Sequence, residues 1–379
     1  MKLNLIFTVP LLMLTLFVDA QKNSLRINPN IVLPKDSNES KALITSLNSF
    51  LAAAQKPNEQ NPYILESQKI ETFILLDEIN GIEKSEKLKD DNFYKPYLTN
   101  IVPVDNTYLI QVSYIGTNEN ESFLRASFEF IAHQSNSSFV FSSPLLRNAK
   151  NWKIEKEGNN TFYYQNIINK KKVKKFNKLA DFFDKKLNSH NKVTDYYCCD
   201  DIMALQKLIG VQYKADYNGR TESVWNSSFA NKKLIVLGNS NSSFDHFDPH
   251  DLWHDRMFMV VDRAKYNKVF DEGCAHLYGG SWGLSWTEIW KLFTDRVSID
   301  KSKNWLDEFG KFTNFGDTPQ KHLRTEYIIS SLIVKKVEKE QGFQKVLELI
   351  SSGPYDKNKY FKTLENVTGI TKANFNEEV

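Results

Sequence analysis

The chain has 379 residues, of which 41% are hydrophobic and 25% are charged, a composition typical of folded proteins. This length suffices for two ordinary domains, and the net charge of +3 is too small to indicate a nucleic acid or an anionic membrane as partner. The 3 cysteines, Cys198, Cys199 and Cys274, are an odd number, which excludes a fully paired disulfide framework. A packed core must therefore supply the stability.

The N-terminal residues 1–20 have the pattern of a secretory signal peptide. Lys2 gives a positive start, an apolar run extends from Leu3 to Val18, and small or apolar residues stand where a signal peptidase reads the chain. We expect cleavage before Gln21, with an uncleaved anchor as the alternative. No later stretch of sequence approaches the ~20 apolar residues of a membrane span. The sequence thus predicts an exported protein, secreted or periplasmic, without a membrane span after cleavage.

Residues 21–38 are expected to form a flexible lead-in, and residues 39–168 a small N-terminal α+β unit. Apolar residues recur at helical spacing over 43–51 and 66–79. From about residue 100 the apolar period changes to two, which indicates strands. The expected strands cover residues 108–115, 123–132, 139–142, 152–155 and 162–165. Helices followed by such strands predict a helix-plus-antiparallel-sheet unit.

Residues 170–379 are expected to form a second domain. The lysine run 170–175 indicates a solvated linker or the polar start of a helix rather than a patch for nucleic acid. Asp201 is placed to cap a later helix and Gly210 to stop it. Two apolar strands are expected on either side of that helix, at 193–198 and 233–237.

Two histidines stand four residues apart in the stretch FDPHDLWHDRM, residues 247–257. Asp248 is in position to cap a helix and Pro249 to open it, so that His250 and His254 fall one turn apart on one helix face. This spacing suits two imidazole ligands of a tetrahedral zinc ion. With 7 histidines in the chain, a chance pair is common enough that the spacing alone is weak evidence.

A second expected helix follows in the stretch FDEGCAHLYGG, residues 270–280. It carries Glu272, 18 residues after His254. Gly273 beside it is small enough for another helix to approach closely, and the glycine pair at 279–280 ends the helix. The two stretches together therefore favour a metal centre more strongly than the histidines do alone.

The pattern H-x-x-x-H with a later E-G-x-A-x-x-x-G resembles the gluzincins of the MA clan, zinc peptidases whose third ligand is a glutamate on the next helix. The resemblance covers residues 170–379, and the stretch 326–353 is similar to the closing part of this clan. It implies a mostly helical peptidase domain with a short edge-stranded sheet. Strand 233–237 resembles the edge strand that receives an extended substrate. The nearest likeness is to single-chain peptidases that follow a small α+β unit in exported bacterial proteins.

The resemblance implies zinc as the cofactor, held by His250, His254 and Glu272. The family's general base is a glutamate, and Asp251 stands in its place. Aspartate is shorter by one methylene, about 1.5 Å of reach, and a misplacement on the order of 1 Å can cost ~100-fold in rate. Three outcomes stay open: a shifted helix that lets Asp251 act, a zinc site with slow turnover, or a binding module that keeps the scaffold.

Further residues are candidates for supporting roles. The oxyanion that forms in peptide hydrolysis needs a partner, for which Tyr327 and His322 are the candidates, although either can be an ordinary structural residue. His276, one turn after the expected carboxylate ligand, is either a hydrogen-bond partner of the centre or a surface histidine. Asp271 and Asp255 are candidates to orient the ligand histidines.

Three tryptophans, Trp282, Trp286 and Trp290, stand at four-residue spacing after the second stretch. Ser285 and Glu288 have the spacing of a capping box, which predicts a helix start. We expect the tryptophans to pack in the core, with an aromatic pocket for a substrate side chain as the alternative.

The sequence thus predicts a secreted zinc-dependent peptidase that hydrolyses bonds in a peptide or protein substrate, with Asp251 and Tyr327 as catalytic residues. A catalytically inactive peptidase-like binding protein that still binds zinc is the alternative, and a cell-envelope structural protein without metal is the third interpretation. A serine-nucleophile elbow, a phosphate loop and a dinucleotide fingerprint are absent from the sequence. Cys274 falls on an apolar helix face, where thiols are inert.

Overall fold

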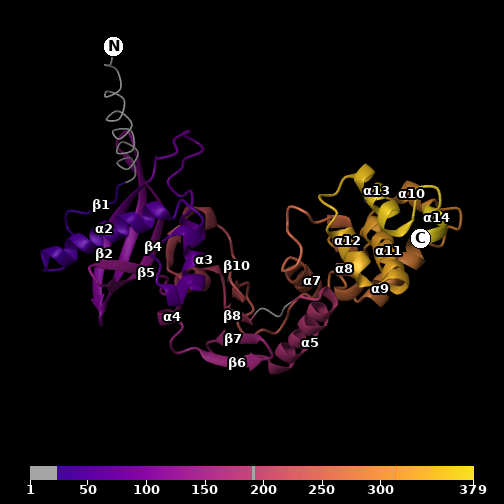
Figure 1. Ribbon diagram of the computed structural model, residues 1–379, viewed down its shortest axis with the longest axis horizontal. Coiled ribbons are helices and arrows are strands. Elements are labelled where there is room, and N and C mark those ends of the chain that lie inside the picture. Colours follow the sequence, from indigo (N-terminus) through magenta and orange to yellow (C-terminus); the bar gives the residue numbers. More distant parts are fainter. Residues whose placement is uncertain (1–23, 190–192, 312) are drawn as a thin grey trace, which may run out of the picture. The chain divides into compact units, whose positions relative to one another are not determined.

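The computed structural model describes residues 24–189, 193–311 and 313–379, which form two compact units (Figure 1). Unit 1 comprises residues 24–168 and 193–243, and unit 2 comprises residues 169–189 and 244–379. The expected signal peptide and the first residues of the expected lead-in lie outside the described residues.

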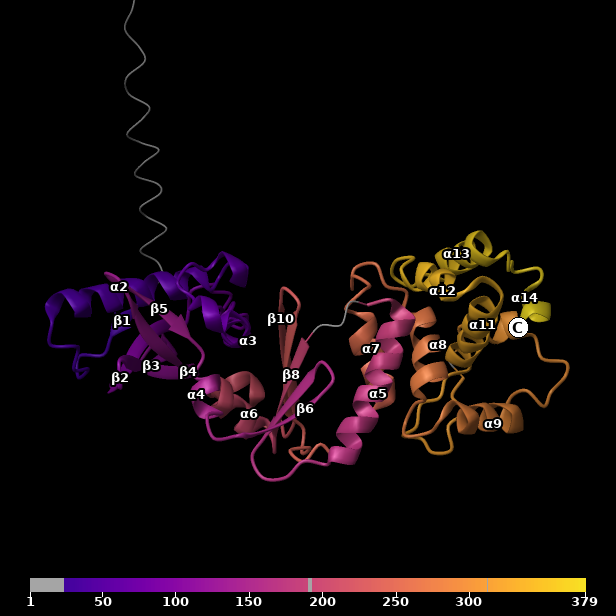
Figure 2. The same cartoon turned by 60° about the horizontal axis from the view of Figure 1, so that its bottom comes forward.

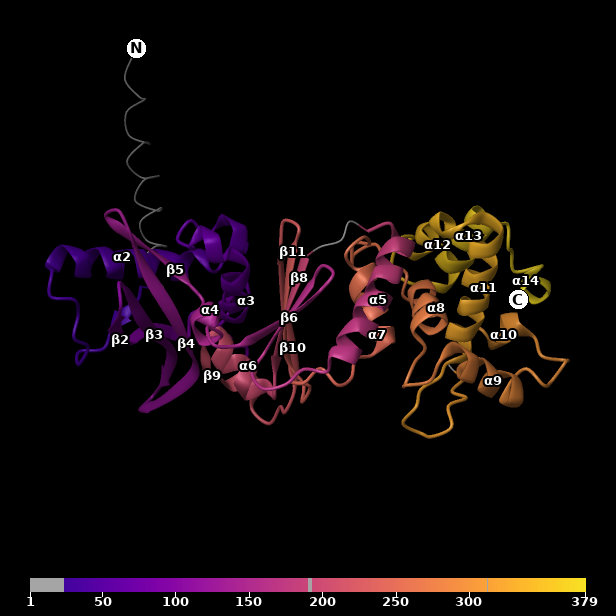
Figure 3. The same cartoon turned by 90° about the horizontal axis from the view of Figure 1, so that it is seen from below.

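The first sheet of unit 1 has six strands, in the order β1-β2-β3-β4-β5, with β9 paired to β4. Neighbours from β2 to β5 are antiparallel, β9 is antiparallel to β4, and β1 is parallel to β2. Figure 3 shows β3 and β4 as the long strands of this sheet. The strands are β1 (Arg26–Ile27), β2 (Lys95–Val104), β3 (Thr107–Asn118), β4 (Glu121–Ser135), β5 (Ser138–Ser142) and β9 (Val211–Lys214).

Two helices, α2 (Ser37–Ala53) and α3 (Lys69–Ile79), build the core of unit 1 with the strands. Phe50 of α2 lies between Phe130 and Phe141 of the sheet, with ring centroids 5.3 and 4.8 Å apart. The remaining short helical segments of unit 1 are η2 (Asn58–Gln60), η3 (Glu66–Gln68), α4 (Leu145–Asn148), α6 (Ile202–Ile209) and η4 (Ala215–Tyr217). Helix α6 begins after the cap Asp201 and ends at Gly210, whose φ is +107°, as the sequence predicts.

The second sheet of unit 1 has five strands in the order β10-β11-β8-β7-β6. The three central strands β11, β8 and β7 are parallel, and the two outer strands are antiparallel to their neighbours. The strands are β6 (Lys153–Glu157), β7 (Asn160–Tyr164), β8 (Val193–Cys199), β10 (Ser223–Phe229) and β11 (Lys232–Gly238).

The predicted fold class is wrong. The protein is 41% helix and 24% strand, with two mixed sheets of six and five strands, rather than an antiparallel unit followed by a mostly helical domain with a short edge-stranded sheet. Strand β11, the expected edge strand, lies between β10 and β8, and six of its seven residues are buried. An unbroken apolar run is typical of a strand covered on both faces, which is what β11 is.

The described residues of unit 2 form helices joined by loops, with two isolated bridges. Helix α8 lies between α7 and α11, as Figure 2 shows, and α5 packs on α7. The lysine run opens α5, with Asn169 as the cap. The helices are α5 (Lys170–Leu187), α7 (Pro249–Met257), α8 (Lys268–Gly279), α9 (Trp286–Arg296), α10 (Trp305–Glu308), α11 (Thr325–Gln341), α12 (Phe343–Ile350), α13 (Lys357–Thr368) and α14 (Phe375–Glu378).

In the part of the chain that the structure describes, none of the helices combines the length and apolar character that crossing a bilayer requires.

Candidate metal centre

The two histidines lie on α7 as the sequence predicts. The side chain of Asp248 accepts a hydrogen bond from the backbone N–H of His250 at 2.8 Å, and Pro249 is the first helical residue. A capping carboxylate and a proline at the first position fix where the helix begins. His250 and His254 therefore come one turn apart on the same face, with ring centroids 4.8 Å apart.

Helix α8 brings a carboxylate to this pair. The Nε2 atoms of His250 and His254 are 3.1 Å apart, and Oε2 of Glu272 is 3.4 Å from Nε2 of His250. The helices approach closely because Gly279 has no side chain: a Cβ there would lie 2.6 Å from the carbonyl oxygen of Pro249. Among the described residues, these three donors form a group whose ligand atoms all lie within 4.8 Å of one another, which is metal-binding distance.

The hydrogen bonds behind the rings determine which nitrogens face the centre. Nδ1 of His250 lies 2.7 Å from the carbonyl oxygen of Gly280, and Nδ1 of His254 lies 2.8 Å from Oδ2 of Asp271. A carbonyl and a carboxylate only accept hydrogen bonds, so both Nδ1 atoms donate. In the neutral rings both Nε2 lone pairs then point at the centre, where they repel each other unless a cation lies between them.

The three side chains are neither sealed off nor fully exposed. His250, His254 and Glu272 keep 13%, 21% and 16% of their side-chain surface accessible. Asp271, which orients one of them, keeps 2%. An ion held here would have an open side toward solvent, which is typical of metal centres that also bind water or a substrate.

The charges around the centre shift the pKa values of its residues. Burial lowers the pKa of His250, but hydrogen bonds from its ring to Glu272 and Gly280 outweigh this and raise it overall. Burial raises the pKa of Glu272, yet the ring of His250 and the neighbouring histidines lower it overall. Desolvation and the negative charge of Asp248 raise the pKa of Asp251. Without a metal the protein thus favours a proton on the His250 ring beside an ionised Glu272, and a bound cation would take the place of that proton.

Asp271 has two partners. It accepts a hydrogen bond from the indole Nε1 of Trp253 at 2.9 Å as well as that from His254. Of the two aspartates considered as orienting residues, it is Asp271 that contacts a ligand histidine. Trp253 is a residue that the sequence analysis missed, because its role depends on the depth at which α7 and α8 pack.

A second buried contact fixes α7 against α5. Arg256, near the end of α7, pairs with Asp184 of α5 at 3.5 Å, and both side chains are buried. The sequence analysis also missed this pair. The only signal in the sequence for this pair is that a charged residue, Arg256, lies on the otherwise apolar side of α7.

Tyr327 and His276 lie beside the centre. The ring of His276 is 5.0 Å from that of His250 and 5.5 Å from that of Tyr327. Burial lowers the pKa of His276 to about 4, and its Nδ1 donates to the carbonyl oxygen of Glu272 at 2.8 Å. His276 is therefore a buried residue and not a surface histidine. Burial, followed by the negative charge of Glu272, raises the pKa of Tyr327 to about 12.

The remaining predicted residues belong to the α8–α9 turn, to α9 and to the segment before α11. His322 is exposed and its ring is 6.4 Å from that of Trp282. The expected capping box of Ser285 and Glu288 is present. The expectation that the tryptophans pack in the core is wrong for Trp282 and Trp290, which are 51% and 37% exposed.

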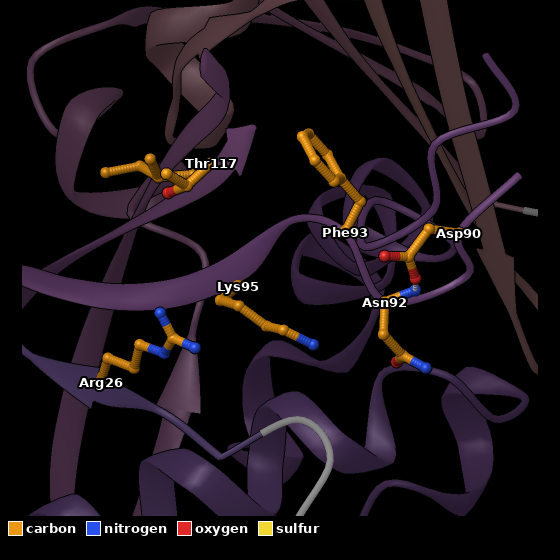
Figure 4. A pocket seen from close by; sticks show the side chains of 7 residues that line it. Arg26, Asp90, Asn92, Phe93, Lys95 and Thr117 are labelled. Carbon is orange, nitrogen blue, oxygen red and sulfur yellow. Dashed lines mark hydrogen bonds between the residues drawn. The ribbon is translucent and has the colours of Figure 1, made fainter. Parts of the chain in front are cut away.

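Unit 1 contains surface pockets of a different kind. One of them has a volume of about 390 Å³, and Figure 4 shows the side chains that line it, among them those of Arg26 and Lys95. Arg26 also donates to the hydroxyl of Tyr97 at 2.6 Å. The lining residues are Arg26, Asp90, Asn92, Phe93, Lys95, Ile115 and Thr117. This lining has no histidine or cysteine, so the chemistry of the histidine centre has no counterpart there.

Comparison with known proteins assigns no relationship: no protein-family model matches the chain, and no curated protein matches it significantly.

Proposed function

We propose that the protein is a zinc-dependent peptidase, in which His250, His254 and Glu272 hold the metal. The observation that carries this proposal is the pair of Nε2 atoms 3.1 Å apart, with the Glu272 carboxylate 3.4 Å from one of them. Zinc bonds of about 2.0–2.1 Å at tetrahedral angles separate neighbouring ligand atoms by about 3.3 Å, which agrees with both distances. Two imidazoles and one carboxylate are a donor set that suits zinc and leaves a fourth position open.

Each residue around the centre has its own role in the proposed hydrolysis. Zinc bound there would lower the pKa of a neighbouring water molecule and polarise the carbonyl group of a peptide. Asp251 accepts a proton from the attacking water and returns it to the nitrogen that leaves, so that the carbon–nitrogen bond breaks with a neutral amine as the leaving group and without free hydroxide as the nucleophile. Tyr327 donates a hydrogen bond to the carbonyl oxygen as negative charge develops on it.

Two features support these assignments. Asp251 lies on α7 between the two histidines, and the charges of His250, His254 and Glu272 all influence its pKa. The ring of Tyr327 lies 5.5 Å from that of His276, which lies 5.0 Å from that of His250, and burial raises the pKa of Tyr327 to about 12, so its hydroxyl remains protonated at neutral pH, ready to donate. The peptide or protein substrate follows from the same chemistry. Export of the chain to the periplasm or the medium is a further proposal, which rests on the apolar N-terminal run.

The short carboxylate of Asp251 supports a second candidate, a peptidase-like protein that binds zinc and peptide without turnover. One methylene is about 1.5 Å of reach, and a general base contributes ~100- to 10,000-fold. The two candidates predict the same metal content and differ in the rate alone.

Metal analysis of the purified mature chain is the first test. We expect about one zinc ion per chain, and close to none in Glu272→Ala, since the ligands must act together. Glu348→Ala on the exposed side of α12 is the matched control and should keep its zinc. A chain that carries no zinc after reconstitution would contradict the proposal.

Cleavage of a peptide library is the second test. Asp251→Asn should lower kcat by ~100-fold or more while zinc content stays the same. Asp251→Glu separates the two candidates: a gain from an inactive native protein supports the binding protein, whereas measurable native activity supports the enzyme. Cleavage that persists unchanged in Asp251→Asn would exclude Asp251 as the base.

A further inference from the structure

The turn between α8 and α9 displays an aromatic side chain at unusual backbone geometry. Ser281 and Leu284 exchange two backbone hydrogen bonds of 3.0 and 2.9 Å, which leaves Trp282 and Gly283 as the two turn residues. Both have positive φ, +53° and +76°. Such two-residue turns strongly prefer Asn-Gly, because a bulky residue with positive φ is strained. Trp282 is nevertheless present, and 51% of its surface is exposed.

This turn is attached directly to the metal centre. The carbonyl of Gly280, which accepts the hydrogen bond from Nδ1 of His250, precedes Trp282 by two residues. Two residues of backbone span at most about 7 Å. The carbonyl oxygen cannot move without disturbing His250, so the start of the turn is held in place by the centre itself.

A hydrogen bond also holds the indole ring. The indole Nε1 of Trp282 donates to the carbonyl oxygen of His322 at 3.3 Å. His322 lies three residues before the start of α11, the helix that carries Tyr327. Trp282 is thus held between the segment that orients His250 and the segment that leads to Tyr327, and its remaining surface faces solvent.

Further aromatic rings follow along α9. The rings of Trp286 and Trp290 are 6.0 Å apart with an angle of 27° between their planes, and Trp290 and Phe293 are 5.5 Å apart at 28°. Trp286 packs partly on the core of this region, whereas Trp290 is 37% exposed. The capping box of Ser285 and Glu288 starts α9 directly after the turn, so the rings of α9 begin where the turn ends.

From these contacts we infer that Trp282 is a specificity-determining residue, which stacks on an aromatic side chain of the peptide next to the scissile bond. The inference rests on the proposed peptidase function and names its substrate class. Flat rings offer a large apolar contact in a fixed orientation, and aromatic pairs stack at ring distances of about 4.5–7 Å. The indole of Trp282 is held by its hydrogen bond and half exposed, so it offers such a contact in a fixed orientation. It also lies within two residues of the carbonyl that orients His250, close enough to reach a peptide side chain next to the scissile bond.

Kinetics on the zinc-loaded protein test this inference. The substrates are peptide pairs of alanine, glycine and serine that differ in a single Phe or Ala, with that position moved along the peptide. We expect kcat/KM at the preferred position to be at least ~10-fold higher for the Phe member. Trp282→Asn should reduce that preference below ~3-fold with little change for the Ala member. An equal preference in Trp282→Asn and native protein, or no preference in the native protein, overturns the inference.

Further variants distinguish a loss of peptide recognition by Trp282 from a loss of folding. Asparagine suits this turn, so Trp282→Asn should leave the unfolding midpoint within about 4 °C. Trp282→Phe should retain most of the preference, and a folded Trp282→Leu should lose it if Trp282→Asn does not fold. Ala230→Asn is the matched control: Ala230 has a φ of +52° in the turn between β10 and β11 of unit 1, and its replacement should leave selectivity unchanged.

Equilibrium binding tests the role of Trp282 separately from the proposed peptidase activity. If the native protein cleaves no peptide, the proposed enzymatic function fails, and calorimetry with the same zinc-loaded protein and peptides still measures affinity. Tighter binding of the Phe peptide that is lost in Trp282→Asn supports the inference without turnover. Equal affinity for both peptides overturns it.

Discussion

Unit 1 has a buried pair of hydroxyl groups between two strands, whereas unit 2 has two buried charged contacts between helices. In unit 1, Ser113 of β3 donates to Ser127 of β4 at 3.0 Å, and both are buried. In unit 2, Asp271 contacts His254, and Asp184 pairs with Arg256. Neutral hydroxyl pairs satisfy each other at little cost, but a buried charge is costly unless it is paired and hydrogen-bonded.

The positions of these charges in unit 2 indicate why they are present. Arg256 lies two residues after His254 on α7, and Asp271 directly precedes Glu272 on α8. A buried ion pair is weak evidence for stability, since apolar residues of similar size often stabilise as well. We interpret both contacts as a means of orientation: they fix the rotation of the two helices that bring His250, His254 and Glu272 together.

The largest expected effect on stability comes from breaking the buried ion pair between Asp184 and Arg256 in unit 2. Arg256→Met leaves the Asp184 carboxylate buried without its partner, so unit 2 should lose about 3–5 kcal/mol of unfolding free energy. The double variant Asp184→Leu/Arg256→Met should recover most of this loss, because no charge then remains uncompensated. Denaturant unfolding of the three proteins measures both effects. If the double variant is as unstable as the single one, then packing and not charge accounts for the loss.

The next effect concerns Glu83 of unit 1, a carboxyl whose pKa is strongly raised. Burial raises the pKa of Glu83 from its ordinary 4.5 to about 7, despite a hydrogen bond of 2.8 Å from Gln55. Below pH 4.5 this group is protonated in both states and has no effect. Between pH 4.5 and 7 the unfolded chain ionises first, so stability falls by about 3 kcal/mol and stays lower above pH 7.

Glu83→Gln should therefore stabilise the protein at pH 8 by up to about 3 kcal/mol and remove this part of the pH dependence. Denaturant unfolding at pH 4 and pH 8 measures the difference. Glu86→Gln, at an exposed position of the same loop, is the control and should change neither value. Zinc content should be the same in both variants. A stabilisation at pH 4 as large as at pH 8 would exclude ionisation as the cause.

The smallest effect is expected from Asp271→Asn in unit 2. The amide can still accept one hydrogen bond but not both from Trp253 and His254, so the ring of His254 is less well oriented. Partners of this kind typically contribute 10- to 100-fold to metal affinity. Competition with a chelating indicator measures the zinc affinity, and Asp295→Asn on the exposed side of α9 is the control. Unchanged affinity would mean that packing alone orients His254.

The candidate centre was accessible to sequence reasoning because its parts are local. Asp248 and Pro249 determine where α7 begins, and this places His250 and His254 on one face. The glutamate on the next helix completes the pattern. The contributions of Gly280, Trp253 and Arg256 were not accessible, because a backbone carbonyl has no sequence signature and buried side-chain contacts depend on the packing of helices far apart in the chain.

The fold was less accessible for the same reason. Period-two patterns located β3, β4 and β5, whose connections are short turns. Strands β8 and β11 are parallel neighbours, and their pairing requires a long connection through α6, β9 and β10. A short apolar segment does not reveal which strands lie beside it, and the edge strand that the resemblance implies at 233–237 is wrong, because β11 lies between β10 and β8. The positive φ of Trp282 likewise appears only once the chain turns back on itself.

Gly273, next to Glu272, lies in the interior of α8, where alanine would stabilise the helix by about 1 kcal/mol. A methyl group at this position would come within 2.8 Å of Oγ and 2.9 Å of the backbone carbon of Ser330 on α11. The hydroxyl of Ser331 donates to the carbonyl oxygen of Gly273 at 2.8 Å across the same contact. The absence of a Cβ at Gly273 thus sets how closely Glu272 on α8 approaches Tyr327 on α11. Replacing Gly273 by alanine would make α8 more stable as an isolated helix, but it would push the two helices apart and widen the candidate centre.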